Sequence, residues 1–335
     1  MDNLTLRSWA RDGLRGVARR VRAAPLILVA LLVILVAFAI VSPGFYSQAN
    51  WLSISLYASE YLLLAVGETV VVITGGIDLS VGATLGFSGM AGALLMQTLL
   101  HGEPHLSGVF VTAIGFGLML VVGAAIGLLN GVLIAGMKLS PFIVTLGTLG
   151  MCSAGIDLVN GGLSVSSIPT QVALIGNTTV AGWLPVPFIV AMVCAIVVWI
   201  VLAKTRFGVR TYAIGSSQLA AVRANIDVRR HLVLVYVLAG ALAGVAGMMV
   251  TARFGEANTG AGAGDELTAI AAVVLGGASL FGGTGTLGGT LLGTGVISAL
   301  TSGLVLSGVE PFWQPFAVGA ILIFAVSVNV RRRAR

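Results

Sequence analysis

Apolar residues run along this chain in long stretches that are separated by short polar segments. A helix needs about 20 mainly apolar residues to cross the ~30 Å hydrocarbon layer of a membrane. Ten stretches come near that length, so the pattern predicts an all-α protein, a polytopic bundle of about ten membrane-spanning helices. The stretches are residues 25–41, 51–74, 79–100, 107–135, 141–159, 186–203, 232–253, 267–281, 286–307 and 312–330.

Lysine and arginine residues orient the predicted bundle, because cytoplasmic loops keep an excess of both. One transmembrane domain, 25–330, lies between a basic segment, 1–24, and a basic tail, 331–335; the long loop 204–231 is also basic. With Lys138, these segments hold 17 of the 18 basic residues. Ten spans with both termini in the cytoplasm place all 17 on that side, whereas an odd number of spans would break the sorting.

Composition agrees with a surface that faces lipid. Hydrophobic residues make up 57% of the 335 residues, charged residues make up 9%, and the mean hydropathy is +1.05. Soluble globular domains carry about 25% charged residues, so this composition excludes a soluble protein. The two cysteines, Cys152 and Cys194, lie inside apolar stretches and show neither a disulfide pattern nor metal-ligand spacing.

Glycine is frequent, with 46 residues in the chain. Many glycines are four residues apart, about one helical turn, so they share a face on which helices can approach closely in a membrane. The sets are Gly82 and Gly86; Gly123, Gly127 and Gly131; Gly240 and Gly244; Gly285, Gly289 and Gly293. This spacing predicts a tightly packed bundle.

Residues 283–288 match the GxGxxG dinucleotide fingerprint, but they lie between apolar stretches and no acidic residue follows until Glu310. The nucleotide-binding pattern GxxxxGK[ST] does not occur in the sequence. We therefore expect that this chain does not hydrolyse ATP, that it is not an enzyme, and that it binds neither a cofactor nor a metal.

Four acidic residues lie in or beside apolar stretches: Glu60, Glu68, Asp78 and Asp157. Charges at such positions normally face the interior of a bundle or a water-filled cavity. Asp78 lies in the glycine-rich segment TGGIDLSVG, 74–82. Either this segment breaks a helix and lines a substrate path, or it is a tight cytoplasmic turn in which Asp78 caps the next helix. The residues alone do not decide between the two.

The loop 204–231 contains a predicted short helix at 218–224 (QLAAVRA). Ser216 or Ser217 can act as its N-cap, and Asn225 can adopt the left-handed conformation that ends a helix. A loop that only fixes topology needs no capped helix. The pattern therefore favours a docking element for a soluble partner.

Four strings carry a family resemblance: GETVVVITGGIDLSVGA (67–83), GLLNGVLIAGMKLSPFIVTLGTLG (127–150), TRFGVRTYAIG (205–215) and DELTAIAAVVLGGASLFGG (265–283). Together they resemble the ribose/xylose/galactose-type permeases of ABC importers, in the branched-chain/monosaccharide permease family. The resemblance runs from about residue 25 to residue 330.

The resemblance implies a multi-pass subunit of the bacterial inner (plasma) membrane that translocates a monosaccharide or a related polyol. In such importers two permease subunits, identical or different, pair with two cytoplasmic ATPase subunits that bind Mg-ATP. A periplasmic sugar-binding protein delivers the substrate. The implied partners are these subunits and the lipid bilayer, and nucleic acid is not among them.

The resemblance also assigns roles to residues. The loop helix is implied to be the coupling helix that seats on the ATPase, although the family usually has glycine where Asn225 stands. The coupling residues are Gly215, Ser217, Gln218, Ala220, Ala221, Arg223 and Asn225. The implied translocation path offers hydrogen-bonding groups and an apolar ring to a neutral sugar at Thr74, Asp78, Ser80, Asn130, Phe142, Thr145 and Thr148. The binding protein is expected to dock near Arg253 and Glu256.

Two other functions fit the residues if the resemblance is set aside. A secondary transporter driven by protons or sodium would use Glu68 or Asp78 as its coupling carboxylate. A channel or a structural membrane subunit is a third possibility.

The predicted orientation can be tested by labelling. Cysteines introduced at positions 103 and 258 should react with an impermeant thiol reagent in intact cells, because both positions lie in predicted outer loops. A cysteine introduced at position 217 should not react. Labelling of position 217 from outside would mean that the predicted orientation is wrong.

Overall fold

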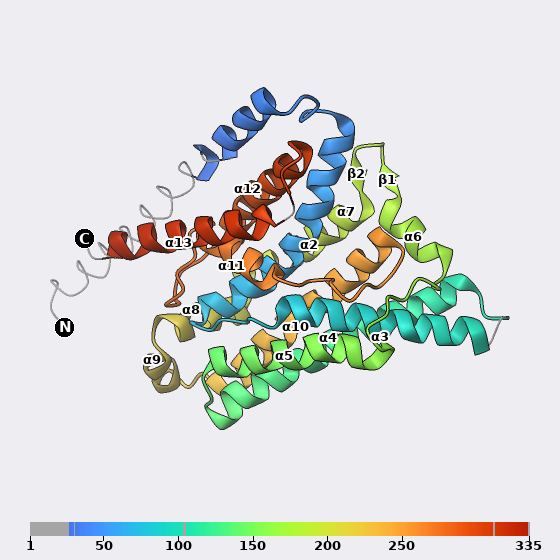
Figure 1. Cartoon of the computed structure of the whole chain (residues 1–335). Coiled ribbons are helices and arrows are strands. Elements are labelled where there is room, and N and C mark those ends of the chain that lie inside the picture. Colours follow the sequence, from blue (N-terminus) through green and yellow to red (C-terminus); the bar gives the residue numbers. More distant parts are fainter. Residues whose placement is uncertain (1–26, 30, 103–104, 311, 334–335) are drawn as a thin grey trace, which may run out of the picture.

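The computed structural model describes residues 27–333 except residues 30, 103, 104 and 311. Helices dominate this part of the chain (Figure 1). After an apolar helix, Ile27–Val41, the elements are α2 Gln48–Ile73, α3 Val81–Gly102, α4 Gly108–Met137, α5 Pro141–Asn160, α6 Thr170–Asn177, β1 Thr179–Val180, β2 Leu184–Pro185, α7 Val186–Lys204, α8 Arg206–Ser216, α9 Gln218–Arg223, α10 Val228–Phe254, α11 Asp265–Leu275, α12 Leu287–Leu306 and α13 Trp313–Arg333. The strands β1 and β2 pair as one antiparallel hairpin, and the predicted all-α class is confirmed apart from it.

Seven of the described helices are long and apolar enough to cross a membrane: α2, α3, α4, α5, α7, α10 and α12. Each of them coincides with a predicted stretch. The first and last predicted stretches contain shorter apolar helices, Ile27–Val41 and Trp313–Ile323. The described helices thus confirm a multi-pass architecture without confirming the count of about ten spans.

The predicted stretch 267–281 is interrupted in the structure, because α11 has only 11 residues. A helix of that length is about 16 Å long, roughly half the thickness of the hydrocarbon layer. Gly276 caps the helix, and Gly277 follows with a φ of +89°, which only glycine adopts without strain. Residues 278–286 then continue without helix to α12. Because apolar residues continue past Leu275, the sequence pattern did not reveal this helix end.

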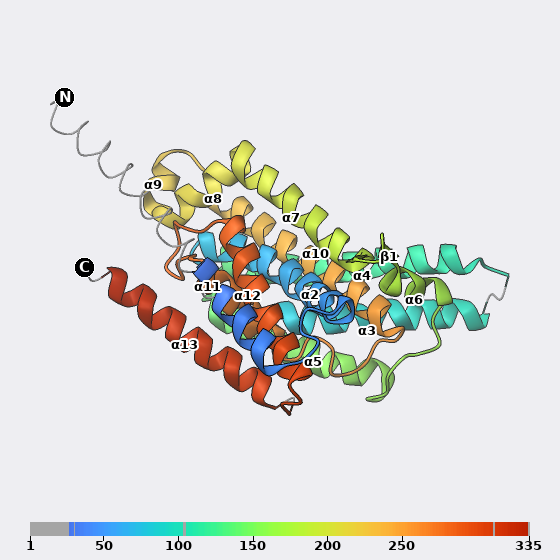
Figure 2. The ribbon, with the colours of Figure 1, turned by 90° about the horizontal axis from the view of Figure 1, so that it is seen from above.

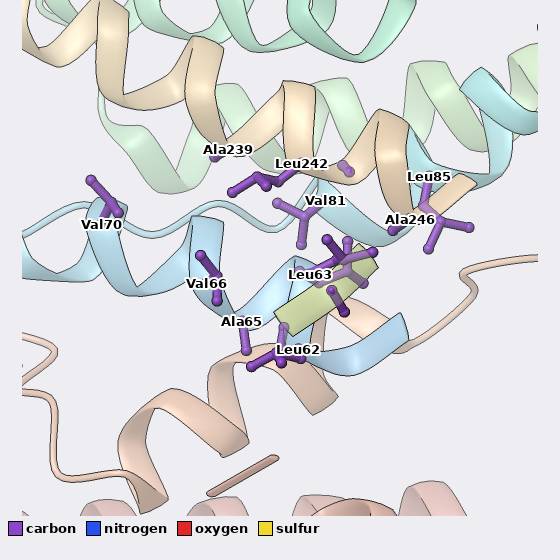
Figure 3. Packing of buried hydrophobic residues seen from close by; sticks show 14 of the residues in the cluster. Leu62, Leu63, Ala65, Val66, Val70, Val81, Leu85, Ala239, Leu242 and Ala246 are labelled. Carbon is purple, nitrogen blue, oxygen red and sulfur yellow. The ribbon is translucent and has the colours of Figure 1, made fainter. Parts of the chain in front are cut away.

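Helix α2 lies at the centre of the bundle. All residues from 62 to 73 are buried, and α2 packs against α10, α12, α7 and α11. Figure 3 shows its leucine and valine side chains meeting Val81 of α3 and Leu242 of α10. A helix that is apolar on all sides is typical of a bundle interior. The chain that follows Ile73 therefore starts inside the protein.

Helices α4 and α10 are packed backbone to backbone through glycines, as the four-residue spacing predicts. A Cβ atom on Gly123 would lie 2.8 Å from the backbone nitrogen of Gly244, and one on Gly127 would lie 2.9 Å from the carbonyl carbon of Tyr236. Real Cβ atoms do not approach so closely, so these positions require glycine. The opposite face of α4 exposes Val121, Leu128 and other apolar side chains, as expected for a lipid-facing surface.

The bundle has two distinct ends in both views (Figures 1 and 2). Helices α8 and α9 lie at one end, where α13 also ends. Helix α6, the β1–β2 hairpin and the connection between α3 and α4 lie at the other end. The predicted basic segment 1–24 lies outside the described residues, as do the last two residues of the tail 331–335.

The glycine contact between α4 and α10 can be tested by substitution. Gly127→Leu should lower the thermal stability of the purified protein in detergent, because overpacking a core costs about 1–3 kcal/mol and here the obstacle is backbone. Gly117→Leu is the matched control, since no atom lies within 4 Å of a Cβ at that position of the same helix. Equal melting temperatures for the two variants would contradict the packing.

Candidate functional site

The segment between α2 and α3 is non-helical and mostly buried. Helix α2 ends at Ile73, and Gly75 turns the chain with a φ of +84°. Gly76 then passes beneath Tyr236, whose Oη would lie 2.6 Å from a Cβ at that position. Asp78 and Ser80 are each 1% exposed. We refer to residues 74–80 as the return segment.

The return segment runs back along α2 instead of crossing the end of the bundle. The Asp78 backbone N–H donates to Glu68 Oε1 at 3.2 Å, and Glu68 precedes the end of α2 by more than one turn. Helix α2 passes α10 at Ala239, whereas α3 passes it at Gly247, eight residues or about 12 Å farther along. Helix α3 therefore begins deep inside the bundle. This arrangement favours a broken helix over a tight turn at the surface.

Several backbone groups of the return segment find partners inside the protein. The N–H groups of Gly75 and Gly76 donate to the carbonyls of Val72 and Val71 at 2.9 and 3.2 Å. Asp78 Oδ1 accepts from the Ser80 backbone N–H at 2.9 Å and from the Ser80 hydroxyl at 2.6 Å. Irregular backbone is tolerated at membrane depth only where protein or enclosed water satisfies it.

Side chains of α4 and α5 extend this network. Asn130 Nδ2 donates to Ser80 Oγ at 2.9 Å, and the Thr148 hydroxyl donates to Asn130 Oδ1 at 2.6 Å. The Thr145 hydroxyl donates to the Pro141 carbonyl at 2.8 Å and reaches the Ile77 carbonyl at 3.5 Å. Helices α4 and α5 are thereby attached to the return segment by hydrogen bonds among buried polar groups.

Two carboxyl groups meet in this network without a basic partner. Glu68 is fully buried, and none of the ion pairs between described residues involves Glu68 or Asp78. Glu68 Oε2 and Tyr236 Oη are buried and have no hydrogen-bond partner within the described protein. Glu68 was singled out from the sequence, but Tyr236 was not, because one tyrosine in an apolar stretch gives no signal.

Six of the seven predicted path residues are buried: Thr74, Asp78, Ser80, Asn130, Thr145 and Thr148. Five of these six belong to the hydrogen-bonded network, whereas the Thr74 hydroxyl donates to the Val71 carbonyl at the end of α2. Phe142 stands apart, with 54% of its surface exposed on the outer face of α5. The network thus forms a wall of packed groups instead of an open channel.

The predicted loop helix is present as α9, and Ser217, the second of the two predicted candidates, is its N-cap. Asn225 has a φ of +60°, the predicted left-handed conformation. Ala221 is 2% exposed and faces the bundle, whereas Leu219 is 77% exposed. Gly215 precedes α9, at the end of α8. Of the predicted coupling residues, Ser217, Gln218, Ala220, Arg223 and Asn225 are exposed.

Arg253 is turned into the protein. Its Nη1 lies 3.8 Å from Glu60 Oε2, with side-chain exposures of 17% and 12%, and its guanidinium lies 4.5 Å from the centre of the Tyr57 ring. Glu256 is partly exposed two residues after α10. Glu60 and Arg253 were each singled out from the sequence. No local pattern indicates that α2 and α10 bring them together.

Asp78 offers a test of the network. Asp78→Leu should abolish uptake of labelled sugar while the protein still inserts, because the Ser80 N–H and hydroxyl lose their acceptor at about 1–3 kcal/mol for each unpaired group. Asp78→Asn keeps an acceptor oxygen and should retain uptake within about threefold. Wild-type uptake by the leucine variant would contradict the network. Loss of gradient-driven uptake with retained downhill exchange in the asparagine variant would indicate proton coupling instead.

Known proteins resemble this chain over most of its length. The family described as branched-chain amino acid transport system / permease component matches residues 50–326. The ribose import permease of Bacillus subtilis (strain 168) is 38% identical over 311 residues, which cover 91% of this chain and 92% of the relative. The galactose/methyl galactoside import permease and the D-allose transport system permease, both of Escherichia coli (strain K12), are each 34% identical; the matches cover 92% and 89% of this chain and 94% and 89% of the relatives. The chain therefore belongs to this family of transport-system permease components.

Proposed function

We propose that the chain is the membrane-spanning permease subunit of an ATP-driven ABC importer for a monosaccharide or a related polyol. The observation that carries the proposal is the similarity, over about nine tenths of the chain, to import permeases of ribose, galactose and allose. ATP would be hydrolysed by a separate cytoplasmic ATPase subunit. A periplasmic binding protein would deliver the sugar, and a second permease subunit would complete the complex.

The proposed topology has ten crossings of the bacterial inner membrane, with both termini in the cytoplasm. Seven long helices and two shorter apolar ones would account for nine crossings. The tenth crossing would be α11 together with residues 255–264, which connect α10 to it. The end that holds α8, α9 and the end of α13 carries the basic loop 204–231, in agreement with a cytoplasmic location.

The proposed sugar path follows the face where parts of α5 and of residues 260–267 are exposed. Ala261 and Ile156 both border Gly86 of α3, so the loop and α5 are neighbours there. Glu266 is partly exposed, and its Oε2 would lie 2.5 Å from a Cβ on Gly82, in the first turn of α3. A carboxylate and irregular backbone at this depth do not face lipid. Water or a second subunit is therefore expected to cover this face.

The residues of the hydrogen-bonded network would support this path without lining it. Phe142 is exposed on the same helix that holds Thr145 and Thr148 in the network, so its ring can meet the apolar face of a sugar. Asp78, Ser80 and Asn130 would hold α3, α4 and the return segment in position, since their hydrogen bonds are made within the protein. Sugar hydroxyls are neutral, so the path would need hydrogen-bonding groups and apolar ring contacts without net charge.

The proposed coupling surface is the exposed side of α9. Leu219 and Val222 are 77% and 60% exposed at an end of the molecule that lies outside the apolar spans. Ala220 follows Leu219 in the chain and is also exposed, and its small side chain lets a partner approach the helix closely. An isolated helix of six residues is unstable in water, so α9 depends on its cap and its contacts.

At the opposite end, docking of the binding protein would involve Glu256 more directly than Arg253. The guanidinium of Arg253 is occupied by Glu60 and Tyr57 inside the bundle. An open hollow of about 450 Å³ lies beside α6 at this end, lined by Thr170, Ala173, Leu174, Asn177 and Thr178. Arg253 would then support the docking surface by holding the end of α10 to α2.

Reconstitution tests the proposed function. The purified chain in proteoliposomes should not take up sugar under a proton or sodium gradient. Addition of the ATPase subunit, ATP and the loaded binding protein should start uptake. Autonomous uptake under an ion gradient would contradict an ATP-driven importer and support a secondary transporter.

The coupling surface yields a sharper prediction. Ala220→Arg should weaken copurification with the ATPase about 5- to 150-fold, because forcing a bulky side chain into a packed contact costs about 1–3 kcal/mol. Expression and docking of the binding protein should be unchanged. Val209→Arg is the matched control, since Val209 is 70% exposed on α8 in the same loop. If Ala220→Arg copurifies and transports like the wild type, α9 is not the coupling surface.

A further inference from the structure

Three segments that are distant in sequence meet at the cytoplasmic end of α2. They are the end of α8, the start of the return segment, and the loop between α11 and α12. Glycines make the contacts, and we refer to Gly75, Gly215, Gly282 and Gly283 as the glycine junction.

The segments at the glycine junction touch through their backbones. The Gly283 N–H donates to the carbonyl of Ile73, the last residue of α2, at 2.9 Å. A Cβ on Gly215 would overlap that same carbonyl oxygen and lie 2.6 Å from the Gly283 nitrogen. A Cβ on Gly282 would lie 2.9 Å from the Gly215 carbonyl oxygen and 3.0 Å from the Cα of Gly75. These contacts are made by backbone atoms.

Side chains reinforce the junction from α8. The Tyr212 hydroxyl donates to the Gly285 carbonyl at 2.8 Å, and the Ser216 hydroxyl donates to the Tyr212 carbonyl at 2.8 Å. Helix α8 is thereby attached to the loop before α12 as well as to the end of α2.

The junction is also closely attached to α9. Ser217 is the only residue between α8 and α9; its N–H donates to Ala213 of α8 at 3.1 Å, and its hydroxyl accepts from the Ala220 N–H of α9 at 3.3 Å. A displacement of α9 is therefore transmitted to Gly215 without an intervening flexible linker. On the other side, Ile73 and Gly75 lead directly into the return segment and its network.

We propose that the glycine junction is the mechanical link between the ATPase-facing helix and the membrane interior. Gly215 acts as a positioning residue, since it places α8 against Ile73 and Gly283 at once. Movement of α9 would then shift the return segment and the α11–α12 loop together. This inference rests on the proposed function, because it needs an ATPase that acts on α9.

Gly215→Ala tests the link directly. Gly215 lies in a helix, so an added methyl group alters the space at the junction without straining the backbone. We expect the variant to assemble with the ATPase and to hydrolyse ATP. The sugar transported per ATP hydrolysed should fall about tenfold, because the methyl group forces α8 away from α2.

Gly288→Ala is the matched control. Gly288 lies in the first turn of α12, and no atom lies within 4 Å of a Cβ there. Transport per ATP should stay within about twofold of the wild type. Tyr212→Phe removes the hydrogen bond to Gly285 and should lower transport per ATP about threefold without altering assembly.

Wild-type transport per ATP in Gly215→Ala would overturn the inference. If Gly215→Ala fails to assemble, Tyr212→Phe decides, and unchanged coupling in that variant would also overturn it. The wild-type complex separates this inference from the proposed function. Uptake without the ATPase contradicts the function, whereas ATP-dependent uptake with unaltered coupling in the variants contradicts only the junction.

Discussion

The structure depends on one constraint. The backbone N–H and C=O groups of a non-helical segment inside a membrane protein must find hydrogen-bond partners. Between Ile73 and Val81 the chain gives up helical hydrogen bonds, and most of this stretch is buried inside the protein, where polar backbone groups need protein partners. Hydrogen-bond partners are supplied by the end of α2, by the carboxyl groups of Glu68 and Asp78, and by Ser80. Asn130 and Thr148 then fix the neighbouring helices to this arrangement.

Close backbone packing is the second condition for this arrangement. Glycines allow α4 to lie against α10. They also allow α8 to contact the end of α2, where the return segment begins. A polar segment in the interior can therefore be connected to a surface helix over a short distance. In an importer, such a connection would let an event at the cytoplasmic surface reach the path without disrupting the bundle.

Patterns with a local physical cause could be predicted from the sequence. Seven long apolar helices, the glycine contacts and the capped helix α9 follow from composition, four-residue spacing and cap residues. The break after α11 and the inward position of Arg253 could not be predicted, since both depend on contacts between distant segments. For the same reason the sequence left two interpretations open for residues 74–82, and the predicted path residues proved to be mostly buried.

Amide hydrogen exchange in residues 74–80 of the assembled complex tests the central claim most directly. If the return segment is held inside the bundle, its amides should exchange as slowly as those of residues 62–73 in the buried part of α2. Exchange as fast as in the exposed turn at residues 161–163 would mean that the segment is an open surface turn, and that result would contradict the account.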